Sequence, residues 1–314
     1  MISEKNFLKT VSCTGKISSA REQIKKNILQ EFKRLLGLKQ KPDYHLGIAF
    51  SGGSARGYAH VGVLQALSEH GVEPDIISGT SMGAIVGVLY AAGYRPGEIK
   101  EILLKESFSK VTGFSWRRMG LFQMEKLKTV IKDYIPEDDF ASLKKPFFLG
   151  LSNLNTACGE IRSSGSIYDY LIASCSVPGM FAPMVLEDSF LVDGGLLCNL
   201  PASAIRDKCR YLIGSHVNFP GKKEGFTGPR AIMERSINLG ITQNAKPQME
   251  LCDFVIDPPA MQHYTLFDFK KIEEIIQVGY EYTTGMINSG ELPVEKLTSG
   301  KRPQAETGTA LRTS

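Results

Sequence analysis

The sequence predicts an α/β protein in which helices cover a parallel sheet, and two observations support this fold class. The first is the order of the elements along the chain: a strand at 45–51, a helix at 58–69, a strand at 75–78 and a helix at 82–92. Strands that alternate with helices in this way form parallel sheets. The second is composition, because 42% of the 314 residues are hydrophobic and 22% are charged, as expected of a globular protein with a substantial core.

The rest of the chain continues this pattern. The further elements are expected in this order: two or three helices within 96–133, a hairpin of strands at 146–152 and 159–163, short strands at 190–192, 211–214 and 253–256, and a helix at 268–287. No internal repeat is found. The simplest partition is one α/β domain at 43–290, between a basic segment at 1–42 and a polar tail at 291–314 that is expected to be disordered.

Residues 17–38 are predicted to form an amphipathic helix within the basic segment. The apolar positions recur at helical spacing, and the basic residues lie elsewhere on the helix surface. The apolar residues are Ile17, Ile24, Ile28, Leu29, Phe32, Leu35 and Leu36, and the basic ones are Lys25, Lys26, Lys33 and Arg34. The helix either packs against the domain or lies on an anionic membrane surface. Both interpretations stay open.

Charge is distributed unevenly along the chain. Residues 1–41 contain ten Lys and Arg and three Glu, a net charge of +7, whereas the whole chain has +4 and its remainder therefore −3. A nucleic-acid-binding groove across the fold would require a positively charged domain. We therefore expect no nucleic-acid partner.

Several classes of protein are disfavoured by what the sequence contains. No run approaches the roughly 18 apolar residues that span a bilayer, and residues 1–20 do not have the apolar block of a secretory signal. The six cysteines include no C-x-x-C pair and show no framework spacing, which indicates reduced thiols rather than disulfides or zinc ligands. We therefore expect a soluble, intracellular protein. The cysteines are Cys13, Cys158, Cys175, Cys198, Cys209 and Cys252.

A candidate nucleophile lies between the second strand and the second helix. The sequence Gly79-Thr80-Ser81-Met82-Gly83 fits G-x-S-x-G, and the strand–turn–helix context is the one that a nucleophile elbow requires. The small residues at 79 and 83 allow a tight turn that exposes the Ser81 hydroxyl. Ser81 would also lie at a helix N-terminus, where the helix dipole stabilises a developing alkoxide.

A glycine-rich loop at 51–57 follows the first strand and precedes the first helix. Its sequence is Ser-Gly-Gly-Ser-Ala-Arg-Gly. Because the carboxyl ends of parallel strands meet at one edge of a sheet, this loop can present backbone N–H groups beside Ser81. A nucleotide phosphate loop is the competing interpretation, but G-K-[ST] is absent and Ser54 stands where G-x-G-x-x-G requires glycine. A tight turn without a function is the third.

Two kinds of residue could act as the base that activates Ser81. A histidine placed after an acid would serve in an α/β hydrolase, and the candidates are His216 and His263. Asp193 follows a short strand and precedes two glycines, so its carboxylate could accept the Ser81 proton directly. Its ordinary pKa near 4 makes it a weak base unless burial raises the pKa. A turn-forming aspartate is an equally good interpretation of Asp193.

Four motifs together resemble the patatin-like phospholipase family. They occur in the family's order and cover about 45–205. The motifs are Phe50 to Gly57 with Ala59 to Leu64, Gly79 to Ala84, Ser176 to Pro183, and Asp193-Gly194-Gly195 with Asn199 and Pro201. One departure is Ser54, where many members have glycine, although a serine N–H can still donate a hydrogen bond.

The resemblance implies a fold, a site and a reaction. The implied fold is a three-layer α/β/α sandwich with a central, mostly parallel sheet. The implied catalytic pair is Ser81 and Asp193 without a histidine, and the implied oxyanion hole is the backbone of Gly52, Gly53 and Ser54. The supporting residues of these loops would be Arg56, Gly57, Gly79, Gly83 and Gly194. The implied reaction is hydrolysis of acyl esters of phospholipids or related lipids.

We therefore expect a serine lipid acyl hydrolase that acts on fatty-acyl esters of phospholipids, lysophospholipids or related lipids. No metal ion and no organic cofactor is expected. The expected location is the cytoplasm, with peripheral contact with an anionic membrane through residues 17–38. An α/β hydrolase with a histidine base and a catalytically silent lipid-binding scaffold remain as alternatives, and the presence of both Ser81 and Asp193 favours an enzyme over a scaffold.

Overall fold

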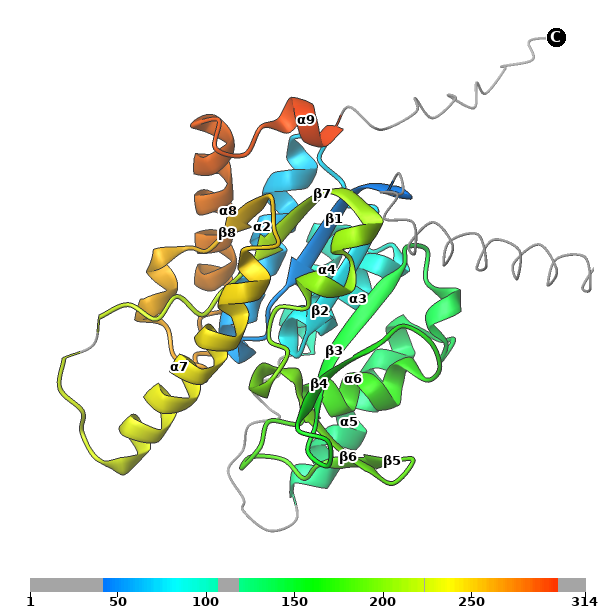
Figure 1. Cartoon of the computed structure of the whole chain (residues 1–314), viewed down its shortest axis with the longest axis vertical. Coiled ribbons are helices and arrows are strands. Elements are labelled where there is room, and N and C mark those ends of the chain that lie inside the picture. Colours follow the sequence, from blue (N-terminus) through cyan, green and yellow to red (C-terminus); the bar gives the residue numbers. More distant parts are fainter. Residues whose placement is uncertain (1–41, 107–118, 223, 299–314) are drawn as a thin grey trace, which may run out of the picture. The chain divides into compact units, whose positions relative to one another are not determined.

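A computed structural model describes residues 42–106, 119–222 and 224–298 (Figure 1). The folded unit begins at Asp43, where the sequence analysis places the start of the domain. The predicted helix at 17–38 lies outside the described residues, as do positions 107–118 and the last part of the predicted tail.

The centre of the unit is a mixed, mostly parallel sheet of eight strands in the described chain, in the order β5-β6-β3-β2-β1-β7-β8 with β4 paired to β3. Strands β1, β2, β3, β7 and β8 run parallel, while β4, β5 and β6 pair antiparallel. The strands are β1 (Tyr44–Phe50), β2 (Ile76–Thr80), β3 (Phe147–Asn153), β4 (Cys158–Arg162), β5 (Met184–Leu186), β6 (Ser189–Asp193), β7 (Cys209–Ser215) and β8 (Phe254–Ile256).

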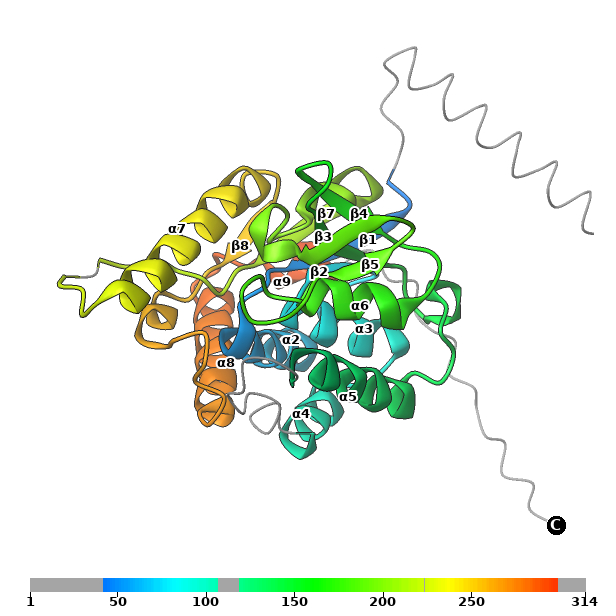
Figure 2. The ribbon, with the colours of Figure 1, turned by 90° about the horizontal axis from the view of Figure 1, so that it is seen from below.

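Helices cover both faces of the sheet, which gives the three-layer α/β arrangement. Figure 2 shows α2, α3, α4, α5, α6 and α8 on one side of the sheet and α7 on the other. The helices are α2 (Ala59–Glu69), α3 (Met82–Ala92), α4 (Pro96–Lys105), α5 (Met119–Tyr134), α6 (Ile167–Cys175), α7 (Pro229–Met249), α8 (Ile272–Asn288) and α9 (Val294–Thr298).

Each face of the sheet has its own hydrophobic core, because side chains alternate along a strand. In β1, Ile48 and Phe50 belong to the large core beneath α2, α3 and α8. Ala49 between them belongs to a smaller core that includes Ala245 of α7. Both faces of β1 are thus buried, which explains why its sequence is an almost continuous apolar run.

The contact between α2 and α8 in the large core depends on two glycines. A Cβ atom on Gly62 of α2 would overlap the backbone carbonyl of Ile276 in α8, and one on Gly279 of α8 would overlap that of Ala59 in α2. The backbones of α2 and α8 therefore touch each other directly. Since α2 follows the glycine-rich loop, this contact also fixes the direction in which the chain leaves that loop.

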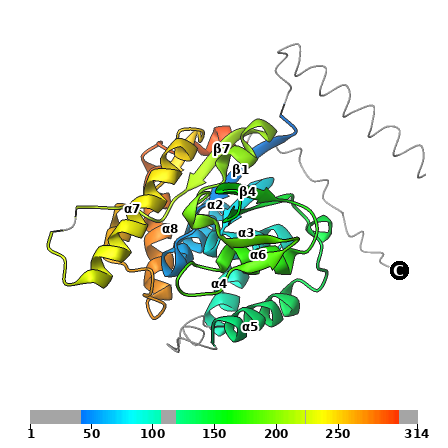
Figure 3. The ribbon, with the colours of Figure 1, turned by 60° about the horizontal axis from the view of Figure 1, so that its bottom comes forward.

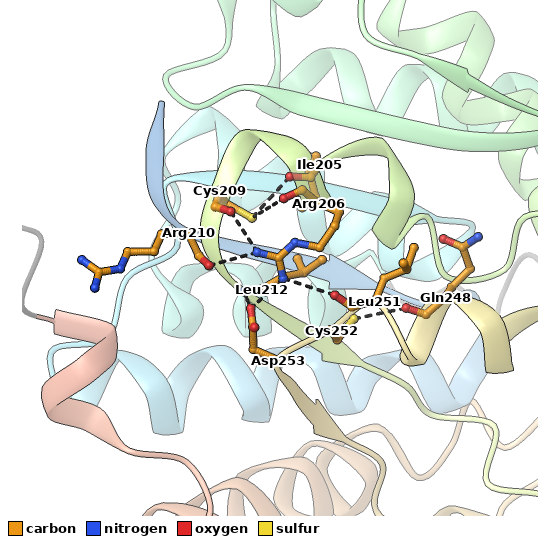
Figure 4. Close-up of polar contacts among 9 residues, drawn as sticks. All are labelled: Ile205, Arg206, Cys209, Arg210, Leu212, Gln248, Leu251, Cys252 and Asp253. Atoms are coloured by element: carbon orange, nitrogen blue, oxygen red, sulfur yellow. Dashed lines mark hydrogen bonds and ion pairs between the residues drawn. The ribbon is translucent and has the colours of Figure 1, made fainter. Parts of the chain in front are cut away.

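Arg206 ties the far end of α7 to the sheet (Figure 4). Its Nη1 donates to Asp253 Oδ2 at 2.6 Å and to Leu251 O at 3.2 Å. Its Nη2 donates to the carbonyl oxygens of Cys209 and Arg210, both at 2.9 Å. These bonds join the residues after α7 to the start of β7, so the C-terminal end of α7 is anchored at the edge where β7 begins.

Most predicted elements are present, and their differences from the prediction have local causes. Helix α8 begins at Ile272 rather than 268, because Asp268 closes a turn in which its Oδ2 accepts a hydrogen bond from Thr265 N–H. Helices α6 and α7 and strand β5 were not predicted. The assignment of 291–298 to a disordered tail is wrong, since α9 lies there and Leu297 is buried.

We expect Gly62→Ala to lower the free energy of unfolding by about 1–3 kcal/mol, because the new methyl group would separate α2 from α8. Gly285→Ala, on α8 itself, is the matched control. A Cβ atom at Gly285 has nothing within 4 Å, so this variant should gain about 0.5–1 kcal/mol from its higher helix propensity. Urea unfolding followed by circular dichroism measures both. Equal stability of the two variants would contradict direct contact of the helix backbones.

Candidate active site

The predicted nucleophile Ser81 lies in the turn between β2 and α3, as the G-x-S-x-G pattern indicates. Its backbone has φ 54° and ψ −125°, a conformation that costs a non-glycine residue roughly 1–3 kcal/mol. A Cβ atom on Gly79 would lie 2.5 Å from Gly83 O, and one on Gly83 would overlap Ser51 O. Glycine is therefore required on both sides of Ser81, and the serine sits at the N-terminus of α3 without a side-chain hydrogen bond to the helix.

Ser81 and the predicted base Asp193 come together across one strand. In the sheet register, Thr80 pairs with Gly150 of β3, and Asp193 pairs with the next residue, Leu151. A Cβ atom on Gly150 would lie 2.5 Å from Thr80 Oγ1, so the close approach needs glycine there. Ser81 Oγ donates a hydrogen bond to Asp193 Oδ2 at 2.6 Å. The two residues singled out from sequence are thus in direct contact.

The environment of Asp193 makes its carboxylate a stronger base than an ordinary aspartate. Its Oδ1 accepts a hydrogen bond from Gly195 N–H at 2.7 Å, and only 6% of the residue is exposed. Burial raises the pKa of Asp193 from 3.8 to about 6, although the hydrogen bonds from Ser81 and Gly195 act in the opposite direction. The group is therefore ionised at neutral pH and holds a proton more readily than a solvated carboxylate.

The glycine-rich loop lies beside Ser81, but its amides are not equally available. A Cβ atom on Gly52 would lie 3.3 Å from Ser81 Cβ, which places the loop next to the nucleophile. Gly52 N–H, however, donates to Asn199 O at 3.0 Å, so the prediction that this amide holds an oxyanion is corrected. Within the described chain, the N–H groups of Gly53 and Ser54 have no acceptor. These two amides are the donors that remain free.

Arg56 anchors the glycine-rich loop through hydrogen bonds. Its Nε donates to Tyr264 O at 2.9 Å, and its Nη1 lies 3.5 Å from Asn218 Oδ1 and 3.4 Å from Asn238 Oδ1. Asn218 in turn donates its side-chain N–H to Gly52 O at 2.6 Å. The guanidinium is buried. Hydrogen bonds to neutral carbonyl oxygens offset part of its desolvation cost, and no carboxylate among the described residues forms an ion pair with it. These bonds support a structural role for Arg56 in the loop.

His60 fixes the first residue of the loop. It is fully buried, and burial lowers its pKa to about 4, so the ring is neutral. Its Nε2 lies 2.8 Å from Ser51 O and its Nδ1 lies 2.8 Å from Ser215 Oγ. Because Ser51 O can only accept, Nε2 carries the proton and Nδ1 accepts from the Ser215 hydroxyl.

The two histidines considered as alternative bases lie in other surroundings. His216 is buried and its Nδ1 contacts Asp257 Oδ1 at 2.9 Å. His263 is exposed in a short 3-10 turn at 259–263. In the part of the chain that the structure describes, neither forms a hydrogen bond with Ser81, whose hydroxyl already donates to Asp193.

Two further predicted loop residues are positions of close approach. A Cβ atom on Gly57 would lie 2.5 Å from Met82 Cγ, and one on Gly194 would lie 2.7 Å from Gly150 O. Gly57 thus brings the glycine-rich loop against the residue after the nucleophile. Gly194 brings the aspartate loop against β3.

Sequence reasoning missed two residues that position the pair. Ser174 Oγ accepts a hydrogen bond from Ser81 N–H at 2.9 Å and donates to Gly150 O at 2.7 Å. Asn244 of α7 donates its side-chain N–H to Gly195 O at 2.9 Å. Only their contacts with residues distant in the sequence distinguish Ser174 and Asn244, so no local pattern could have identified them.

The described residues also bear on membrane-spanning helices and metal sites. No helix among them is both long enough and apolar enough to cross a bilayer. No group of three or more His, Cys, Asp and Glu side chains in this part of the chain is arranged to hold a metal ion.

Comparison with known proteins adds a family match. A family model described as patatin-like phospholipase matches residues 48–205, half of the chain. This range contains the glycine-rich loop, Ser81 and Asp193. The motifs that suggested the family from sequence and the region that the model matches therefore coincide.

The similar curated proteins are much longer than this chain. Lysophospholipase NTE1 of Kluyveromyces lactis is 29% identical over 280 residues, which cover 76% of this chain and 19% of that protein. Lysophospholipase NTE1 of Pyricularia oryzae is also 29% identical, over 318 residues that cover 86% of this chain and 20% of that protein. The chain thus spans about a fifth of the length of these relatives. Among solved structures, VipD from Legionella pneumophila is 13% identical with a TM-score of 0.49, over 80% of this chain and 68% of that one.

We expect the parent to lose about 3 kcal/mol of stability between pH 4 and pH 7, the equivalent of a pKa raised from 3.8 to about 6, whereas Asp193→Asn should not. The sign follows from the raised pKa: the unfolded chain ionises Asp193 first, so the parent loses stability as the pH rises from about 4 to about 6. The asparagine variant has no such loss. Urea unfolding at a series of pH values measures the difference, with the exposed Asp207→Asn as control. A difference that is the same at pH 4 and pH 8 would contradict the raised pKa.

Proposed function

The chain belongs to the patatin-like phospholipase family, and from that premise we propose that it hydrolyses the fatty-acyl ester bonds of phospholipids or lysophospholipids. The observation that carries the proposal is the 2.6 Å hydrogen bond from Ser81 Oγ to the buried Asp193 Oδ2. It joins a hydroxyl in a strained turn to a carboxylate with a raised pKa, and both lie beside free backbone amides. These are a nucleophile, a base and an oxyanion site.

The first half of the proposed reaction transfers the acyl group to the enzyme. Ser81 Oγ attacks the ester carbonyl carbon while its proton passes to Asp193 Oδ2. The carbonyl oxygen becomes an oxyanion, which the N–H groups of Gly53 and Ser54 hold. The carbon–oxygen bond to the alcohol then breaks, and the leaving oxygen takes the proton from Asp193.

The second half releases the acyl group. A water molecule gives a proton to Asp193 and attacks the acyl carbon, and the same two amides hold the second oxyanion. Ser81 Oγ leaves and recovers the proton, which restores the starting state. A pKa of about 6 suits Asp193 for both directions of proton transfer near neutral pH. This sequence uses no group beyond the chain, the lipid and water.

The choice of a lipid ester as substrate is supported by the family and by the similar lysophospholipases. The location that we propose is the cytoplasm, with peripheral contact with a membrane. Neither a histidine base nor a silent scaffold has an observation in its favour that matches the contact between Ser81 and Asp193.

We expect Ser81→Ala and Asp193→Asn to lose hydrolysis of a soluble p-nitrophenyl ester and of lysophosphatidylcholine. Removal of the nucleophile should abolish turnover, and removal of the base should cost on the order of 10²–10⁴-fold. His216→Ala and His263→Ala should keep most of the activity, because neither ring contacts Ser81. Initial rates of the purified variants measure the effect. Labelling of Ser81 by a fluorophosphonate probe, located by mass spectrometry, is the independent check.

Two results would contradict the mechanism. A histidine variant as inactive as Asp193→Asn would favour a histidine-dependent triad. Activity of Ser81→Ala at more than a few per cent of the parent would remove Ser81 as the nucleophile. Urea unfolding of Asp193→Asn establishes that the variant is folded, so that its inactivity could not be attributed to unfolding.

Residues 17–38 are the second part of the proposal, as a basic amphipathic helix that contacts anionic lipid. Deletion of residues 1–41 should weaken binding to anionic vesicles and flatten its salt dependence, since basic residues near such a surface contribute roughly 1 kcal/mol each. Hydrolysis of a soluble ester should change little. Vesicle co-sedimentation at several salt concentrations measures this. Unchanged binding by a truncated protein with a lower melting temperature would indicate that the helix packs on the domain instead.

A further inference from the structure

Helix α7 buries polar side chains and exposes several large apolar ones. The residues that it buries include Asn238 and Thr242, together with Ala245. Its exposed residues include polar ones such as Gln243, but 53% of Ile232 and 62% of Met233 are accessible to solvent. This is the reverse of the usual arrangement in a surface helix, whose apolar stripe faces the core. We call the four exposed apolar residues the α7 apolar face: Ile232, Met233, Ile237 and Leu239.

The inward polar side of α7 is explained by the site. Thr242 Oγ1 donates to Asn218 O at 3.2 Å, and Asn218 holds the glycine-rich loop through Gly52. Asn238 accepts from Arg56, and Asn244 holds the aspartate loop. Hydrogen bonding to both catalytic loops thus accounts for every polar group named here. It does not account for the apolar residues on the other side.

The α7 apolar face belongs to the half of the helix that extends past the sheet. Figures 1 and 3 show the C-terminal part of α7 beside β7 and its N-terminal part running outward, toward the end where β1, β2 and β3 have their carboxyl ends. The aspartate loop also has exposed apolar residues. Leu196 and Leu197 are exposed, and Asn244 of α7 bonds the carbonyl oxygen of Leu196 at 3.1 Å.

We propose that the α7 apolar face docks this protein on a phospholipid bilayer, by insertion of its side chains at the boundary between headgroups and acyl chains. The proposal rests on the lipid hydrolase function above, and it names the surface through which the site meets its substrate. The segment 220–240 supports this occupant, because it contains four Lys and Arg and two Glu. An apolar helix face in a segment of net positive charge suits insertion into an anionic bilayer.

Docking through α7 has a direct consequence for the site. The same helix carries the apolar face on its outside and bonds both catalytic loops on its inside. Insertion of the outer side chains therefore places the loops one helix diameter, roughly 10 Å, from the bilayer.

The experiment compares Ile232→Asp and Met233→Asp with Leu251→Asp in the full chain. Leu251 is also an exposed apolar residue, but it lies beyond the anchored end of α7. Binding to vesicles of phosphatidylcholine and phosphatidylglycerol in equal parts is measured by co-sedimentation at high salt, which weakens the contribution of basic residues elsewhere. Melting temperatures establish that the variants fold. A second readout is the ratio of phospholipid hydrolysis in vesicles to hydrolysis of a soluble ester.

We expect each variant of the α7 apolar face to bind vesicles at least roughly tenfold more weakly, because a charge replaces an inserted apolar side chain. The hydrolysis ratio should fall in parallel, and Leu251→Asp should match the parent. Equal binding by all three variants would overturn the proposal. A parent that is dimeric and becomes monomeric on Met233→Asp would overturn it in favour of a contact between two copies. A parent that binds through the face but cleaves no ester would contradict the hydrolase function and still support the docking surface.

Discussion

The hydrogen bond between Ser81 and Asp193 is the contact on which the arrangement of the site depends. It joins β2 to β6 across β3, and this is possible only because β3 has glycine at position 150. The carbonyl oxygen of Gly150 also accepts the Ser174 hydroxyl that receives Ser81 N–H. A single residue without a side chain thus sets the spacing of the nucleophile, the base and the residue that orients the nucleophile.

The electrostatics of the site follow from burial more than from charge pairing. Among the residues that the structure describes, Asp193 is held by two hydrogen-bond donors and by no cation, and burial therefore raises its pKa. Arg56, the charged group that anchors the glycine-rich loop, is held by carbonyl oxygens, and His60 is neutral. Burial rather than a paired charge therefore sets the basicity of Asp193.

The parts of the site that could be predicted from sequence are those whose determinants are local. The strand, turn and helix around Ser81 are encoded within 76–92, and the two glycines beside it are visible in the pattern. Asp193 could be proposed but not chosen over a histidine, because the choice depends on a register across β3. The bond from Gly52 N–H to Asn199 O joins distant positions and removes a donor that the loop sequence alone suggested. Helix α7 could not be predicted from an apolar stripe, because polar residues of this helix face the domain and apolar ones face outward.

The direct contact between the backbones of α2 and α8 also bears on what constitutes a folding unit. The recognisable motifs end near residue 205, yet Gly62 within them lies in direct contact with the backbone of α8, near Gly279. Strand β7, the other neighbour of β1, likewise lies outside the matched range. A fragment limited to 48–205 would therefore contain every residue of the proposed chemistry. It would lack α8 and β7, which pack against α2 and β1. The range matched by a family model and the unit that folds cooperatively need not have the same boundaries. In this protein the folded unit extends to α9.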